Sequence, residues 1–261
     1  MTAAGQFEAG GAVFRYHSLG RAAGSEAAHL IWAHGWGQDH RVFSGLAGQI
    51  ERAGVHTLLD FPGFGDSPRP PKDWGTADYA DAVATWLGTL SFRHTIWIGH
   101  SFGCRVGLQL AARHPDMVGG MILIAAAGLQ RRRTPLQRLR LAGKVASYKL
   151  IKRMAALGVP LERWRDRFGS ADYRSAGPMR GILVKVIGED LTAVAARVAC
   201  PVRLIYGSRD DETPPEMGWR LQKLIPNASL TIVEGCDHHT ILTDGLHQIL
   251  FHLDRFLKVA T

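Results

Sequence analysis

A lone serine between two glycines is the first place in this sequence where chemistry is expected. The stretch "WIGHSFGC" (97–104) places Gly99 two residues before Ser101 and Gly103 two residues after it, between an apolar run and a helix-like run. Glycines at this spacing allow a turn so tight that neighbouring side chains must be absent, and the turn pushes the serine outward. A serine hydroxyl is a weak nucleophile unless a base takes its proton and a preorganised pocket receives the negative charge. The spacing therefore predicts a nucleophile whose partners lie elsewhere in the chain.

Candidate partners follow three other apolar runs. "LIYGSRDDE" places Asp210 after one run, and "TIVEGCDHHTIL" places His238 and His239 after the next. "IWAHGWGQDH" ends in a turn, 34–37, whose backbone N–H groups can face the same site. An imidazole held by a carboxylate is the usual base for a serine nucleophile. A serine, an acid and a histidine are thus all predicted at the carboxyl ends of strands.

Short apolar runs alternate with helix-length stretches through most of the chain. Strands are predicted at 29–35, 55–60, 95–101, 119–127, 202–207 and 229–235, and helices at 40–53, 76–90, 102–113, 214–224 and 240–258. Runs without polar alternation are typical of strands buried on both faces of a parallel sheet. The order predicts a doubly wound, mostly parallel α/β sheet with its site at the carboxyl ends of the strands, and an antiparallel edge strand at 13–20.

A basic segment interrupts this alternation. Residues 129–190 contain 15 Lys and Arg against 5 Asp and Glu, a net of +10, whereas the rest of the chain has a net of −2. Thr134 and Pro135 begin a predicted helix, and Gly158 ends it. A further helix is predicted in "GPMRGILVKVIGEDL". We therefore expect a core domain formed by 1–128 and 191–261, with 129–190 as a helical lid over the strand ends.

Composition excludes several classes of protein. The 261 residues carry a formal net charge of +8, but the basic run lacks the interleaved aromatic side chains of a nucleic-acid-binding surface. No apolar run approaches the roughly 18 residues that span a bilayer, so no stable membrane insertion is expected. Three widely spaced cysteines support neither a disulfide framework nor a zinc site. We expect a cytoplasmic protein without a bound metal.

The order of these motifs resembles the α/β-hydrolase superfamily over nearly the whole chain. The matching pieces are the H-G-W-G turn at 34–37, "DFPGFGDS" at 60–67, the G-x-S-x-G turn at 99–103, G-x-x-D at 207–210 and a late histidine. The resemblance implies a mostly parallel, doubly wound sheet with a helical lid inserted after the sixth strand. It also implies catalysis that uses no cofactor.

The same resemblance implies a role for each site residue. Ser101 would be the nucleophile, His238 the general base and then acid, and Asp210 the residue that orients the imidazole. The backbone N–H groups of Trp36 and Phe102 would form the oxyanion hole.

Two positions have neighbours of the same type. Asp211 is the alternative to Asp210, although the G-x-x-D spacing favours Asp210. His239 is the alternative to His238, because Asp237 stands where the family usually has a glycine before the histidine. His34 and His239 are also candidates for contact with the substrate or lid.

The implied reaction is hydrolysis of a carboxylic ester or thioester through an acyl-enzyme on Ser101. Serine at this turn disfavours the related haloalkane dehalogenases and epoxide hydrolases, which use aspartate there. A carbon–carbon bond hydrolase with the same triad and a catalytically idle binding protein remain alternatives, and the sequence leaves the oligomeric state open.

The basic lid suggests a class of partner. The "HGWG" turn, "PGFGDS" and the basic segment are similar to esterases that act on pimeloyl-carrier-protein methyl esters, a family that engages an acidic carrier protein. We therefore expect basic lid residues to dock such a carrier, with the candidates Arg131, Arg132, Arg133, Arg138 and Arg140.

Overall fold

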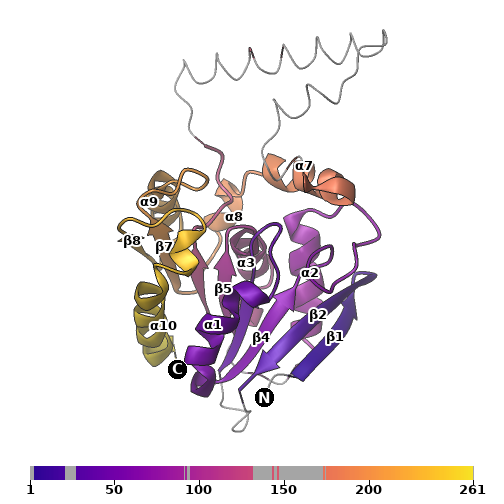
Figure 1. Ribbon diagram of the computed structural model, residues 1–261, viewed down its shortest axis with the longest axis horizontal. Helices are drawn as coiled ribbons and strands as arrows, with labels where there is room; N and C mark the ends of the chain where they lie inside the picture. Colours follow the sequence, from indigo (N-terminus) through magenta and orange to yellow (C-terminus); the bar gives the residue numbers. More distant parts are fainter. Residues whose placement is uncertain are drawn as a thin grey trace.

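A computed structural model describes residues 3–20, 28–90, 92, 95–131, 143, 146, 173 and 175–260. Its centre is an eight-stranded sheet in the order β1-β2-β4-β3-β5-β6-β7-β8 (Figure 1). The strands are β1 Ala3–Ala9, β2 Ala12–Leu19, β3 His29–Ala33, β4 Val55–Asp60, β5 Thr95–His100, β6 Gly120–Ile124, β7 Val202–Gly207 and β8 Ala228–Val233. Strands β3 to β8 pair in parallel, so their carboxyl ends meet at one edge. The predicted sheet is confirmed.

The amino-terminal strands correct one expectation. Segment 13–20 is part of an antiparallel strand, β2, but β2 is not at the edge, because β1 pairs with its outer side. The β1 sequence, "AAGQFEA", contains one large apolar residue, Phe7, and has no clear strand pattern. Its Phe7 ring stacks on Phe14 at 4.5 Å and on Trp86 at 4.3 Å between ring centroids. These tertiary contacts hold a strand that local sequence alone does not predict.

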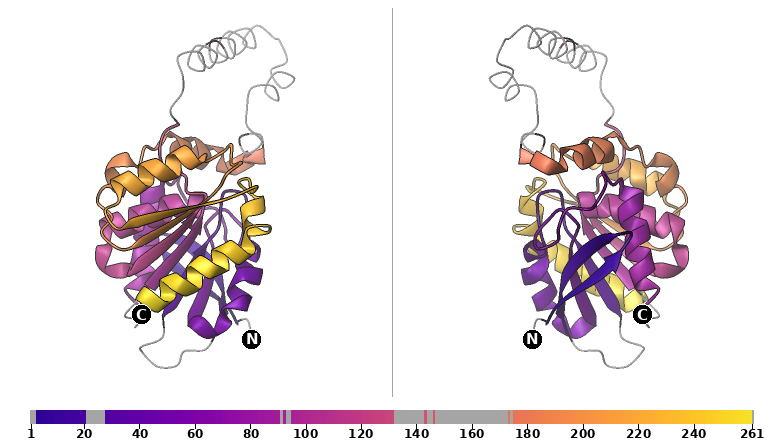
Figure 2. Two further views of the ribbon diagram at one scale, coloured as in Figure 1. Left: turned by 90° about the vertical axis from the view of Figure 1, so that its left-hand side faces the viewer. Right: turned by 90° about the vertical axis from the view of Figure 1, so that its right-hand side faces the viewer.

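Helices cover both faces of the sheet (Figure 2). They are α1 Arg41–Gln49, α2 Thr76–Leu87, α3 Phe102–Arg113, α7 Arg180–Gly188, α8 Thr192–Ala195, α9 Pro215–Leu224 and α10 Leu246–Ala260. Short 3₁₀ turns lie at Glu51–Ala53, Pro115–Met117, Gly177–Met179 and Thr240–Leu242. The last of these turns replaces the start of the helix predicted at 240–258, and α10 begins only after it. None of the helices in the described ranges is long and apolar enough to cross a lipid bilayer.

Two apolar cores lie on either side of the sheet. One lies against α2, α3, α8 and α9 and includes Trp97 and Tyr206, whereas the other lies against α1 and α10 and includes Trp32 and Phe43. Every residue of β3, β5 and β6 is buried. Burial on both faces explains why these strands read as continuous apolar runs. It also fixes the loops at their carboxyl ends, which carry the candidate site.

Helix α7 is tied to the core by polar contacts. Both carboxylate oxygens of Glu189, directly after the helix, accept hydrogen bonds from Thr76 at the start of α2. Arg105 of α3 donates to the carbonyl of Val186 at 3.0 Å, and Lys185 donates to the carboxylate of Asp78 at 3.3 Å. Figure 1 shows α7 above the strand ends. Its contacts with α2 and α3 hold it there from two sides. Of the helix predicted to begin at 134 and end at 158, only Gly143 and Ala146 lie among the described residues, and both are helical.

Candidate active site

Ser101 occupies a strained turn between β5 and α3. Its backbone angles are φ 47° and ψ −101°, a conformation that residues other than glycine rarely adopt. A Cβ atom added at Gly103 would lie 2.0 Å from the carbonyl oxygen of Ala33. One added at Gly99 would lie 2.9 Å from the backbone of Gly103. The two glycines therefore allow the turn to press against β3, as their spacing around the serine predicts.

Three side chains from distant parts of the chain meet at this turn. The Nε2 atom of His238 lies 3.0 Å from Oγ of Ser101, and its Nδ1 atom lies 2.8 Å from Oδ2 of Asp210. A carboxylate can only accept, so Nδ1 carries the proton and Nε2 is free to accept one from the serine hydroxyl. His238 and Asp210 are both buried. The arrangement can move a proton from Ser101 to His238 while the hydroxyl oxygen attacks an electrophile.

Asp210 is held as a charged group. Its Oδ1 atom accepts the backbone N–H groups of Glu212 at 2.8 Å and Thr213 at 2.7 Å. Burial by itself raises the pKa of Asp210, but the hydrogen bond and charge of His238 and the Thr213 hydrogen bonds together hold this pKa below its ordinary value. Asp211, the alternative acid, is exposed. The structure thus places Asp210 against the imidazole.

The hydroxyl of Thr213 joins this group, although no motif in the sequence points to it. Its Oγ1 atom lies 2.8 Å from Oδ2 of Asp210, 3.2 Å from Nδ1 of His238 and 3.1 Å from the carbonyl oxygen of Ala125. A threonine three residues after an aspartate is common in ordinary turns, so its type and spacing do not distinguish it. Thr213 fixes the acid against the end of β6.

His100 connects the loop of His238 to the turn that follows β3. Its Nε2 atom lies 3.0 Å from the carbonyl oxygen of His238, and its Nδ1 atom lies 3.0 Å from Oε1 of Gln38. The N–H of Gly35 donates to the same Gln38 oxygen at 2.9 Å, so both partners of the ring are acceptors. Burial, followed by the charge of His238, lowers the pKa of His100 to about 3. The ring is therefore neutral at physiological pH and can donate to one acceptor at a time.

The backbone amides of Trp36 and Phe102 lie on adjacent turns. Their rings contact each other edge to face, with centroids 5.7 Å apart, and the N–H of Gly103 donates to the carbonyl of His34 at 3.0 Å. Phe102 is the first residue of α3, so its N–H has no partner within the helix. Within the described ranges, neither of these two amides donates to another backbone group. The two amides therefore have no competing backbone acceptor in the described part of the chain.

His34 is buried beneath this turn. Its Nδ1 atom donates to the carbonyl of Gly35 at 2.7 Å, and its Nε2 atom accepts the N–H of Phe61 at 3.0 Å. Burial lowers the pKa of His34 to about 4, so the ring is neutral. Both nitrogens hold the backbone around the turn. The placement of His34 therefore does not support the expected contact with a substrate.

Of the other substrate and lid candidates, only His239 and Arg131 lie among the described residues. His239 is exposed, and its Nε2 atom lies 3.4 Å from Oε1 of Glu212. Arg131 is exposed at the end of a described stretch. The predicted docking arginines at 132, 133, 138 and 140 lie outside the described residues.

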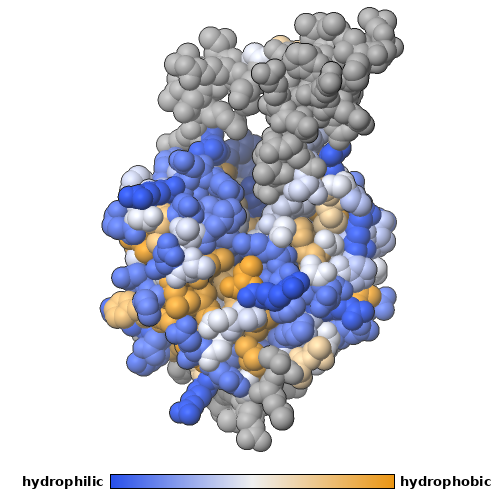
Figure 3. All heavy atoms as spheres, viewed as in Figure 1, coloured by the Kyte–Doolittle hydropathy of each residue, from blue (hydrophilic) through white to orange (hydrophobic). Residues whose placement is uncertain are grey.

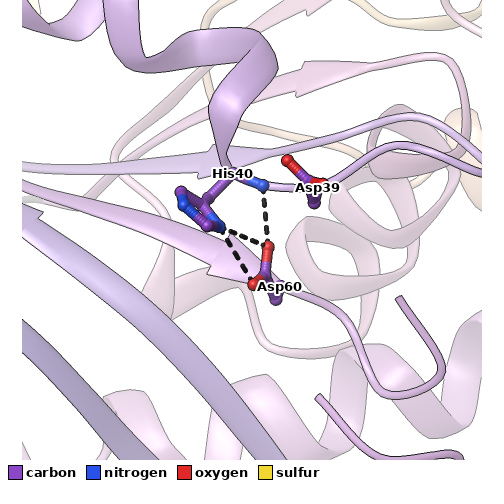
Figure 4. A group of neighbouring side chains, drawn as sticks. All are labelled: Asp39, His40 and Asp60. Carbon is purple, nitrogen blue, oxygen red and sulfur yellow. Dashed lines mark hydrogen bonds and ion pairs between the residues drawn. The ribbon is translucent and has the colours of Figure 1, made fainter. Parts of the chain in front are cut away.

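A separate polar group surrounds Asp60 (Figure 4). The backbone N–H of His40 donates to Oδ1 of Asp60 at 2.7 Å, and its ring lies 3.0 Å from both carboxylate oxygens. The N–H of Asp66 donates to Oδ2 at 3.0 Å. Asp39 completes a set of possible metal ligands, but its carboxylate accepts two hydrogen bonds from Arg41. Because the chain itself fills these oxygens, the group organises the 60–67 loop, and we assign it no metal.

Comparison with known proteins identifies the fold family of the chain. A family model described as "alpha/beta hydrolase fold" matches residues 28–245. A pimeloyl-[acyl-carrier protein] methyl ester esterase of Chromobacterium violaceum is 29% identical over 243 residues, which cover 86% of this chain and 94% of that protein. An esterase of the same name from Neisseria meningitidis serogroup A is 27% identical, covering 80% of this chain and 70% of that protein.

Solved structures share the architecture. The enol-lactonase from Burkholderia xenovorans LB400 superimposes with a TM-score of 0.73 at 20% identity, covering 97% of this chain and 100% of that one. This likeness concerns the fold alone. The family match spans strands β3 to β8, the Ser101 turn and the residues around Asp210 and His238. This chain belongs to the alpha/beta hydrolase fold family and is a hydrolase.

Proposed function

We propose that this hydrolase cleaves a carboxylic ester or thioester through an acyl-enzyme on Ser101. The observation that carries the proposal is the 3.0 Å approach of Ser101 Oγ to His238 Nε2, with Asp210 at the other ring nitrogen. A serine hydroxyl becomes a competent nucleophile when a positioned base can take its proton. The family membership of the chain supports the same reading.

The reaction proceeds in two halves. Oγ of Ser101 attacks the carbonyl carbon of the substrate while its proton passes to Nε2 of His238. The resulting oxyanion accepts hydrogen bonds from the amides of Trp36 and Phe102, where each donor contributes on the order of 10² to 10³ in rate. His238 then gives the proton to the leaving alcohol or thiol. Water repeats the sequence on the acyl-enzyme and releases a carboxylic acid and free Ser101.

For the substrate, we propose an acyl ester presented by an acidic carrier protein. The curated relatives named above are esterases of a pimeloyl-[acyl-carrier protein] methyl ester. Residues 129–190, which we assign to a lid between β6 and β7, carry a net charge of +10. A basic cover of this kind would attract an acidic carrier and bring its acyl chain to Ser101. Arg131 is the exposed, described member of the basic set.

A panel of p-nitrophenyl esters and thioesters of increasing chain length tests the reaction class. We expect turnover by the wild type, with a preferred chain length, and loss of at least about 10³-fold of that activity in Ser101→Ala. A Ser101→Ala variant that retains wild-type hydrolysis would refute the acyl-enzyme. Carbon–carbon cleavage would appear instead as activity on a vinylogous diketone with none on the esters.

A matched pair of substrates tests the carrier. The same acyl methyl ester is offered on acyl carrier protein and as a free small molecule, at low and high salt. We expect kcat/KM to be higher for the carrier-bound ester and to fall with salt for that substrate only. Equal kcat/KM for the two substrates at every salt concentration would remove the carrier from the proposal and leave the esterase.

A further inference from the structure

Glu212 places a second carboxylate beside the imidazole of His238. Its Oε2 atom lies 3.6 Å from Nε2 of His238, and its Oε1 atom lies 3.4 Å from Nε2 of His239. Oδ2 of Asp210 lies 2.8 Å from the other ring nitrogen. His238 thus has one carboxylate at each ring nitrogen. Only Asp210, at Nδ1, belongs to the triad of Ser101, His238 and Asp210 described above.

The two carboxylates differ in their surroundings. The Asp210 side chain is fully buried and receives backbone hydrogen bonds, whereas the Glu212 side chain is 55% exposed. A separation of 3.6 Å is too long for a hydrogen bond. In the resting site Nε2 of His238 has no proton, because that nitrogen accepts from Ser101. The Glu212 carboxylate therefore has neither a hydrogen bond nor a charge attraction to the neutral ring.

Proton transfer from Ser101 changes this balance. His238 becomes an imidazolium, and its new N–H lies at the nitrogen that Glu212 faces. A negative charge at this distance attracts the charged ring much more strongly than the neutral one. An interaction that is stronger in the transition state than in the resting state accelerates the reaction.

In the described part of the chain, the titratable groups that face the ring are Asp210, Glu212, His100 and His239. The ring centroid of His100 lies 5.0 Å from that of His238, but burial keeps His100 neutral. His239 meets the ring edge to face at 5.3 Å between centroids, and its side chain is 69% exposed. Asp210 cannot be removed without dismantling the triad. Among these groups, Glu212 carries the negative charge near Nε2, and a substitution can remove this charge without altering the triad.

We propose that Glu212 is a positioning residue that stabilises the imidazolium of His238 during attack by Ser101. It thereby raises the pH below which the base is lost. The inference rests on the proposed function, since it concerns the same proton transfer, and it adds a residue that no sequence motif marks.

Two measurable effects follow from this one interaction. In Glu212→Gln the ring should keep its proton less readily, so the acid limb of the pH profile moves to lower pH by about 0.5 to 1 unit. The rate on the plateau at higher pH should fall by about 3- to 10-fold, because a pKa change of about 0.5 to 1 unit corresponds to that factor in rate. The two profiles should converge at low pH, because there the ring is charged in both the free enzyme and the transition state.

The experiment compares Glu212→Gln with Asp211→Asn. Asp211 is adjacent and exposed, so its substitution removes the same charge without removing the carboxylate at the ring. We would titrate the ring C–H signal of His238 by NMR and measure the rate of fluorophosphonate labelling of the full chain between pH 4 and 9. Glu212→Gln should lower both midpoints by about 0.5 to 1 unit, Asp211→Asn by less than half as much, and about 1 M salt should reduce the difference.

Unchanged midpoints in Glu212→Gln, or a shift no larger than that of Asp211→Asn, would overturn the proposal. Glu212→Lys provides a second arm, since reversing the charge should move the midpoints further in the same direction, and movement toward higher pH would contradict the inference. The NMR readout needs no substrate. If the wild type is never labelled at Ser101, the proposed function fails, while the titration still decides whether Glu212 acts on His238.

Discussion

At the scale of single residues, the structure distinguishes most clearly between the two adjacent candidates for the acid, Asp210 and Asp211. Asp210 accepts hydrogen bonds from two backbone amides and from His238, whereas Asp211 is exposed. Asp210→Asn replaces an acceptor with an amide, so the imidazole loses the partner that fixes its tautomer. We expect kcat to fall by about 10⁴-fold in Asp210→Asn and to stay within about 2-fold in Asp211→Asn. Steady-state ester hydrolysis by the two variants checks this, and a larger loss in Asp211→Asn would reassign the acid.

The sequence identified the residues of the site that have a distinctive spacing. Ser101 between its glycines could be placed from spacing alone, whereas the family resemblance favoured Asp210 over Asp211 and His238 over His239. Thr213, His100 and Glu212 could not be found in this way. Their positions depend on which side chains the loops bring together, for example the 3.2 Å between Thr213 Oγ1 and His238 Nδ1. Conversely, His34 looked available in the sequence, but the fold buries both of its ring nitrogens in backbone hydrogen bonds.

At the scale of elements, we expect the turn between β5 and α3 to tolerate substitution least. In Gly103→Ala the new methyl group would meet the backbone carbonyl of Ala33, which cannot move without displacing β3. We expect the free energy of unfolding to fall by about 1 to 3 kcal/mol and ester hydrolysis to drop steeply, because the adjacent Phe102 amide would shift. Chemical denaturation and kcat/KM measure the two effects.

A second helical glycine gives the matched control. Gly45 in α1 is exposed, and a Cβ atom there meets nothing within 4 Å. Alanine is favoured over glycine in a helix, so Gly45→Ala should raise the free energy of unfolding by about 0.5 to 1 kcal/mol and leave hydrolysis unchanged. If Gly103→Ala behaved like Gly45→Ala, the close approach of the turn to β3 would not be essential.

The sequence predicted strands β4 and β7 at their observed ends, 55–60 and 202–207. Strands β3, β5 and β6, which are buried along their whole length, were predicted with ends that run into the following turns. Strand β1 was missed, since its sequence is mostly small residues and its one large apolar residue, Phe7, is held by aromatic contacts with Phe14 and Trp86. The terminal helix was predicted too long because the 3₁₀ turn at Thr240–Leu242 is apolar and helix-like in sequence.

At the scale of the whole molecule, charge and apolar surface are distributed unevenly. The basic charge of the sequence belongs to 129–190, while the rest has a net charge of −2. Figure 3 shows polar and apolar side chains mixed on the face seen in Figure 1, with apolar groups gathered near α1 and α10. Among the described residues, the exposed large apolar side chains are Val184, Ile187, Trp219 and Phe251. The net positive charge of the sequence thus comes from this one segment.

The most direct test of a nucleophilic Ser101 is the mass of the intact chain after treatment with a fluorophosphonate. Attack by Ser101 Oγ on phosphorus expels fluoride and leaves a phosphonyl group on the serine. We expect one adduct per chain, carried by the tryptic peptide 94–105, in which Ser101 is the only serine. Ser101→Ala should show no adduct. An unlabelled wild type, or an adduct that persists in Ser101→Ala, would contradict the proposed mechanism.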